Sequence, residues 1–156
     1  MDEKIAPNSE TRPISKIAPI SAAGLAYMGD AVFELNVRKM LLDEGSRPVS
    51  ALNKKARGYV SASAQAAMYH YIEPFLTEEE QSIMRRGRNL HTQSKAKNAD
   101  VSDYRHATGL EALFGYLFLQ GEEKRLAEVF ELCIQEKING KDSNNPTGKT
   151  PTNPIG

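Results

Sequence analysis

Residues 25–34 read LAYMGDAVFE and place one carboxylate, Asp30, within an apolar helical stretch. Residues 110–117 read LEALFGYL and do the same with Glu111. An ionised carboxylate among apolar side chains is costly unless a cation or a hydrogen-bond donor accompanies it. Two such acids, far apart in the chain, predict a divalent cation held between two helices. The spacing leaves one alternative open, in which Asp30 is buried and paired with an Arg or Lys of another helix.

The ligand type and the surrounding residues favour a hard cation. Carboxylate oxygens suit Mg²⁺, with Mn²⁺ as a substitute, better than they suit zinc. Small residues beside both acids, among them Gly29 and Gly115, would let the two helices approach closely. Glu34 lies four residues after Asp30 and shares its helical face; it could add a ligand, but we favour a solvated or ion-paired role.

Apolar spacing of three and four residues dominates the chain, so the sequence predicts an all-α fold of about six helices. No alternating strand pattern competes. Expected boundaries come from caps and helix breakers: Ser21 to about Leu42, Pro48 to Gly58, Ser61 to before Pro74, Thr77 to Gly87, Ser102 to Leu119 closed by Gly121, and Glu122 to Ile138. Residues 88–100 are expected to form a loop.

The chain has 156 residues, enough for one domain with its own core. We expect a loose N-terminal lead-in over residues 1–20, a folded domain over 21–138 and a disordered tail over 139–156. A single cysteine, Cys133, excludes a disulfide framework within the chain and is expected to be buried. No apolar run is long enough for a membrane helix and no secretory signal is visible, so we expect a cytoplasmic protein.

Basic residues gather locally although the formal net charge is zero. Residues 47–105 hold ten Lys or Arg against six Asp or Glu. Such a surface can bind phosphate backbones without reading bases, although a merely solvated surface has the same composition. The candidate phosphate contacts are Lys54, Lys55, Arg57, Arg85, Arg86, Arg88, Lys95 and Lys97.

Five motifs together resemble one known family. Residues 27–32 (YMGDAV) resemble the signature helix of ribonuclease III catalytic domains, and residues 110–115 (LEALFG) resemble their second acidic helix. Three further motifs are similar to those of its short bacterial branch, the Mini-ribonuclease III enzymes, which have no double-stranded-RNA-binding domain: residues 60–66, 86–89 and 97–101. The resemblance covers residues 21–138.

The resemblance implies an all-helical homodimer that cuts double-stranded RNA with Mg²⁺, with Asp30 and Glu111 as catalytic metal ligands. It implies products with 5′-phosphate and 3′-hydroxyl ends. It also implies a role in maturing the precursor of large-subunit (23S) ribosomal RNA, with a ribosomal protein as a possible helper.

The sequence departs from the longer members of this family at two positions. Ala26 and Thr108 stand where those enzymes carry carboxylates, so water or Thr108 would have to fill the place of a ligand. Two other functions remain open: a non-catalytic RNA-binding relative, and a helical metal-dependent nucleotide hydrolase. Retention of both Asp30 and Glu111 favours catalysis over the first, and the basic residues favour RNA over the second.

Overall fold

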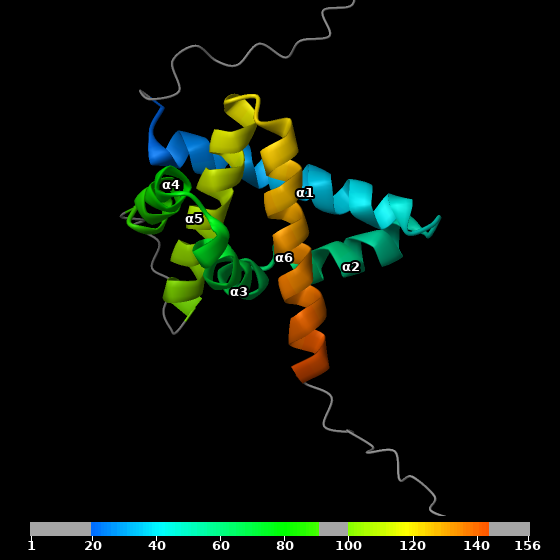
Figure 1. Ribbon diagram of the computed structural model, residues 1–156. Helices are drawn as coiled ribbons and strands as arrows, with labels where there is room; N and C mark the ends of the chain where they lie inside the picture. The colour runs from blue at the N-terminus through cyan, green and yellow to red at the C-terminus, as the bar shows by residue number, and fades with distance from the viewer. Residues whose placement is uncertain (1–19, 91–99, 144–156) are drawn as a thin grey trace, which may run out of the picture.

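The computed structural model of the protein describes residues 20–90 and 100–143, which form six α-helices, one short 3₁₀ helix and no strand. This confirms the all-α prediction. The helices, in chain order, are α1 (Ala22–Asp43), α2 (Val49–Val60), α3 (Ala62–Ile72), α4 (Glu78–Arg88), α5 (Asp100–Leu119) and α6 (Glu123–Ser143), with the 3₁₀ helix η1 (Glu73–Phe75) between α3 and α4. Figure 1 shows their arrangement.

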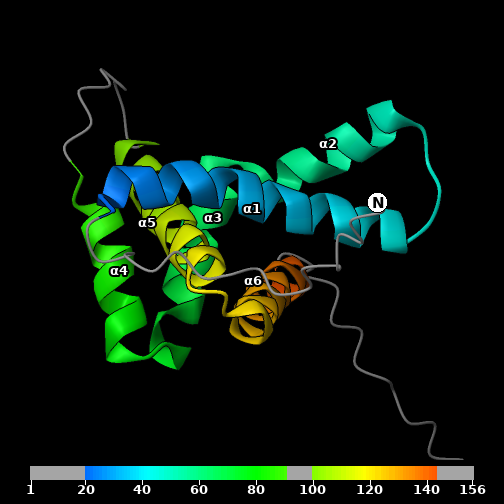
Figure 2. The same cartoon turned by 90° about the horizontal axis from the view of Figure 1, so that it is seen from above.

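Helix α5 is the centre of the fold. It packs against α1, α3, α4 and α6, and its contact with α1 is the most extensive in the molecule. Phe114 of α5 and Phe33 of α1 meet edge to face with ring centroids 5.1 Å apart, and Phe130 of α6 lies 5.9 Å from Phe33. The core therefore holds α1 and α5 in a fixed relation. The C-terminal half of α1 extends away from this body with α2 beside it (Figures 1 and 2).

The helix boundaries follow the caps that the sequence predicts. The Ser21 hydroxyl accepts a hydrogen bond from the Gly24 amide at 3.0 Å, and the Ser61 hydroxyl accepts one from Ala64 at 3.3 Å. Thr77 and Glu80 form the predicted capping box. Gly121 closes α5 with φ of 73°, a left-handed conformation that glycine adopts without strain.

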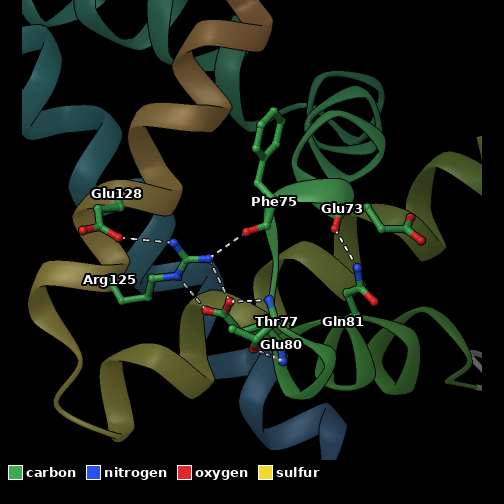
Figure 3. Close-up of polar contacts among 7 residues, drawn as sticks. All are labelled: Glu73, Phe75, Thr77, Glu80, Gln81, Arg125 and Glu128. Atoms are coloured by element: carbon green, nitrogen blue, oxygen red, sulfur yellow. Dashed lines mark hydrogen bonds and ion pairs between the residues drawn. The ribbon is translucent and has the colours of Figure 1, made fainter.

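The capping-box glutamate has a second role that the sequence analysis did not predict. The Glu80 carboxylate, nearly buried, accepts two hydrogen bonds of 2.9 Å from the guanidinium of Arg125 (Figure 3). Arg125 also donates to the Phe75 carbonyl at 3.0 Å and to Glu128 at 3.2 Å. Burial disfavours the charge on Glu80, but the hydrogen bonds from Arg125 and Thr77 outweigh it and lower the pKa of the carboxyl. This network joins α4 to α6.

Several boundaries differ from the sequence predictions. Helix α6 continues to Ser143, past the expected end at Ile138, and its Lys137 ammonium donates to the Gly58 carbonyl of α2. Gly58 lies inside α2 rather than ending it, and Pro48 is the N-cap instead of a first-turn residue. The lead-in 1–19, the loop segment 91–99 and the tail 144–156 lie outside the described residues, and so do Lys95 and Lys97.

Candidate active site

The closest approach of α1 and α5 occurs at two glycines. A Cβ atom built on Gly29 would lie 1.5 Å from the carbonyl oxygen of Glu111, and one built on Gly115 would lie 1.9 Å from that of Leu25. No side chain larger than hydrogen fits at either position. The two backbones are therefore in direct contact at this level. This contact brings Asp30, the neighbour of Gly29, next to Glu111.

The negative charge of Asp30 acts on the Glu111 carboxyl. Burial raises the pKa of the Glu111 carboxyl, and the negative charge of Asp30 raises it further, to about 7. A hydrogen bond from the side chain of Gln65 opposes this shift. Glu111 is thus held in a position where a positive charge would be favourable.

Gln65 belongs to the site although the sequence analysis did not single it out. It lies on α3 and is only 3% exposed. Its hydrogen bond to Glu111 links α3 to the α1–α5 contact. The available signal was an amide in the middle of the Ala-rich stretch 62–67, where a buried polar side chain needs a partner.

The burial expected for Asp30 is wrong. Its side chain is exposed, and Glu111 alone is largely covered. The reason is that the other described residues leave the face of α1 that carries Asp30 and Ala31 uncovered. The alternative reading of Asp30 fails as well, because no Lys or Arg within the described ranges forms an ion pair with it. Glu34 pairs with Arg38 at 2.8 Å, which confirms its prediction.

Few side chains near the helix contact could coordinate a metal ion. Across residues 20–90 and 100–143, no group of three or more His, Cys, Asp or Glu side chains is placed to hold a metal ion. Asp30 and Glu111 bring two carboxylates to the helix contact, and the Gln65 side chain lies beside Glu111. Thr108 donates its hydroxyl proton to the Tyr104 carbonyl at 2.9 Å, which leaves its lone pairs available. Ala26 is buried and offers no donor.

The six basic candidates within the described residues separate into two groups. Lys54, Lys55 and Arg57 lie exposed on α2. Arg85, Arg86 and Arg88 occupy the last turn of α4, where Arg86 and Arg88 line two different pockets. The structure therefore does not bring the predicted basic residues together in one cluster.

Two lysines of α6 join the first group. Lys54 and Lys55 line a groove of about 520 Å³ together with Lys137 and Lys141. Lys137 also lies 5.5 Å from the ring centroid of Tyr59. Neither lysine was predicted as a phosphate contact. Lys137 immediately precedes the helix end expected at Ile138 and Lys141 follows it, and both lie more than 80 residues from Lys54 in the sequence. We call these four residues the lysine groove.

Two further predictions concern residues outside the site. Cys133 is fully buried and burial raises the pKa of its thiol, which suits a packing residue and not a nucleophile. In the described part of the chain, none of the helices combines the length and the apolar character that a membrane crossing requires.

Comparisons with known proteins identify the family of this chain. The Ribonuclease III domain family matches residues 23–122. A Mini-ribonuclease 3 of Symbiobacterium thermophilum is 49% identical over 107 residues, which are 69% of this chain and 82% of that protein. A Mini-ribonuclease 3 of a Thermoanaerobacter species is 41% identical over 128 residues, 82% of this chain and 90% of that protein.

The fold is likewise shared with a solved structure. The crystal structure of protein FN1578 from Fusobacterium nucleatum is similar with a TM-score of 0.67 and 32% identity, and the match covers 78% of this chain and 98% of that one. The family match spans the helices that carry Asp30, Gln65 and Glu111. The chain belongs to the ribonuclease III family.

Proposed function

We propose that this protein cleaves double-stranded RNA with a Mg²⁺ ion held by Asp30 and Glu111. Membership of the ribonuclease III family makes the chain an endoribonuclease. The observation that carries the metal proposal is the convergence of two carboxylates, from α1 and α5, at a backbone contact that only glycine permits. Mn²⁺ would substitute, since it accepts the same oxygen ligands.

The residues present fit a divalent cation. Burial and the charge of Asp30 raise the pKa of Glu111 to about 7, so ionised Glu111 is unfavourable until a cation neutralises the pair. Two carboxylates with water in the remaining positions are a normal arrangement for Mg²⁺. When bound, the ion would supply an activated water and stabilise negative charge on the phosphodiester. Products with 5′-phosphate and 3′-hydroxyl ends are expected.

The protein residues would act by holding and orienting. The Gln65 side chain would hold the Glu111 carboxylate in place through the hydrogen bond between them. The lysine groove and the Arg-rich end of α4 would bind the RNA backbone through phosphate charge. Double-stranded RNA is recognised mainly by shape and backbone, so sequence preference would be modest and salt dependence strong.

A homodimer is supported by the uncovered face of α1. Ala23, Tyr27, Ala31, Leu35 and Leu42 follow helical spacing along one stripe, and all five are exposed. Tyr27 is 83% exposed and Leu35 is 65% exposed, which is unusual for large apolar side chains on a folded domain. A second copy of α1 would cover this stripe and the neighbourhood of Asp30.

The cellular substrate we propose is the precursor of 23S ribosomal RNA, processed in the cytoplasm with a ribosomal protein as a possible helper. This proposal rests on the resemblance to the Mini-ribonuclease branch, which the relatives of that name support. Deleting the gene should leave the ends of 23S ribosomal RNA unprocessed. Normal ends in the deletion strain would contradict the substrate and leave the chemistry untouched.

One gel tests the activity itself. A long RNA duplex is incubated with the wild type, with Asp30→Asn and with Glu34→Gln, each with Mg²⁺ and with chelator. Glu34 lies one turn from Asp30 and pairs with Arg38, so its variant is the matched control. We expect cleavage by the wild type and Glu34→Gln only, and only with Mg²⁺. Binding without cleavage by the wild type would favour the non-catalytic alternative, and hydrolysis of free nucleotides in place of duplex would favour the other.

A further inference from the structure

A second pocket, separate from the carboxylate pair, lies between the end of α4 and the start of α5. It has a volume of about 450 Å³ and is lined by Arg88, Asn89, Val101, Ser102, Arg105 and His106. A pocket of this size accommodates a nucleotide-sized group. Neither Arg88 nor Arg105 forms an ion pair with an acid in the described part of the chain. Two cations without counter-ions thus line one cavity.

His106 is held in place at the edge of this pocket. Its Nδ1 atom lies 2.6 Å from the carbonyl oxygen of Ser102. Because a carbonyl can only accept, Nδ1 carries a proton and donates it to Ser102. The other ring nitrogen, Nε2, is then left free of this internal bond, and it becomes a second donor when the imidazole is charged.

The aromatic wall behind His106 is tightly packed. The His106 ring centroid lies 4.5 Å from that of His70 and 4.8 Å from that of Tyr69. Tyr69 is only 1% exposed, and the Arg88 side chain lies near its hydroxyl, although no hydrogen bond of good geometry joins the two. Burial raises the pKa of this hydroxyl, and the positive charge of Arg88 partly offsets the shift. This packing fixes the position of the His106 ring at the edge of the pocket.

The charges around the pocket favour an anion. Arg85 contributes a third positive charge near Tyr69. The nearby acids are Glu73 on η1, which acts on Tyr69, and Asp100 and Asp103 in the first turn of α5. Asp100 and Asp103 complement the helix dipole of α5 at its N-terminus. The pocket lining itself contains no acid.

The pocket lies close to the carboxylate pair. Tyr69 and Gln65 are four residues apart on α3, which is a rise of about 6 Å. His106 and Glu111 are five residues apart on α5, a rise of about 7.5 Å. Successive nucleotides of one strand advance roughly 3 Å along an RNA duplex, less than in B-form DNA, so an axial separation of this size corresponds to about two to three nucleotides.

We propose that Arg88, Arg105 and His106 bind one phosphate of the RNA backbone, within about three nucleotides of the phosphate that is cut. This inference rests on the proposed function and adds to it a second, fixed contact with the same strand. Its effect would be to set the register of the duplex over Asp30 and Glu111. The cleaved bond then depends on where this second phosphate lies.

The test removes one charge from each partner. Short RNA duplexes with 5′-hydroxyl ends carry a single neutral methylphosphonate linkage at successive positions, so that only internal phosphates are probed. Their dissociation constants are measured with Asp30→Asn, which leaves the duplex uncut, and with the same chain also carrying Arg105→Ala. Arg105 is exposed, and circular dichroism checks that the variant is folded. Lys124→Ala, on the exposed start of α6, is the charge-matched control.

We expect Arg105→Ala to raise the dissociation constant about 5- to 10-fold and to lower the salt slope by about one unit or slightly less. At one linkage, the methylphosphonate should raise the dissociation constants of the Asp30→Asn and Lys124→Ala proteins by a similar factor. For the Arg105→Ala protein the same linkage should change the dissociation constant less than about 2-fold, because the contact is already lost. His106→Gln should identify the same linkage. That linkage should lie within about three nucleotides of the wild-type cut.

Two results would overturn the inference alone: duplex binding with no linkage that depends on Arg105, or dependence at a linkage more than half a helical turn from the cut. A chain that binds no RNA duplex at all would overturn the proposed function, and this inference with it.

Discussion

Replacing Gly29 by alanine tests the contact on which the site depends. The added methyl group would stand 1.5 Å from the Glu111 carbonyl oxygen and 2.8 Å from the Gly115 amide nitrogen. Both neighbours are backbone atoms of α5, so no side chain can rotate away. Carbon and oxygen need a separation of roughly 3.3 Å. The two helices must therefore move apart by roughly 1.5–2 Å at this level.

The cost follows from the packing that such a movement disrupts. Overpacking a well-packed core costs typically 1–3 kcal/mol, and the α1–α5 contact is the most extensive of the fold, so we expect a loss of about 3 kcal/mol or more. Gly58→Ala is the matched control, because its methyl group would meet only the Lys137 ammonium at 3.7 Å. It should gain about 0.5–1 kcal/mol from helix propensity.

Urea unfolding of both variants and the wild type, at one protein concentration, measures this difference. Movement of α1 also separates Asp30 from Glu111, so cleavage by a folded Gly29→Ala should fall about 100-fold or more. A Gly29→Ala protein within about 1 kcal/mol of the wild type would refute the backbone contact between α1 and α5.

Three further predictions concern other parts of the molecule. Arg125→Met leaves Glu80 buried without its cation and should lower the free energy of unfolding in urea by about 3 kcal/mol. The pKa of Glu80 is lowered in the folded state, so the stability that its ion pair contributes to the wild type should disappear as the pH falls below the ordinary carboxyl pKa. Glu111→Gln should stabilise the metal-free protein by about 2 kcal/mol above pH 7, and this gain should vanish below pH 4.5. The reason is that the pKa of Glu111 in the folded protein, about 7, exceeds the ordinary value of 4.5, so ionisation of this carboxyl opposes folding. The double variant Lys137→Ala, Lys141→Ala should lower the salt slope of duplex binding by about two units, and an unchanged slope would exclude the lysine groove from the RNA interface.

The fold was predictable from local signals. Ser21, Ser61 and the Thr77–Glu80 box each satisfy backbone amides within their own first turn, so the helix starts could be read without knowing the tertiary structure. The end of α6 could not. Its last residues are anchored by Lys137 on the Gly58 carbonyl, 79 residues away, and the local composition gives no sign of that contact.

The site was predictable in part. Asp30 and Glu111 stood out because acids are rare in apolar helical stretches, and the structure brings them together. The exposure of Asp30 was missed because a helical apolar pattern does not reveal which face is covered within one chain. Gln65 and the pairing of Glu80 with Arg125 were missed because both depend on contacts between distant segments.

Direct measurement of cation binding tests the central claim, that Asp30 and Glu111 share one divalent ion. Mn²⁺ binding to the RNA-free protein can be followed by electron paramagnetic resonance in the wild type, Asp30→Asn, Glu111→Gln and the Glu34→Gln control. We predict one site in the wild type and the control, and its loss in each of the other two variants. Unchanged Mn²⁺ binding in either Asp30→Asn or Glu111→Gln would contradict the shared site.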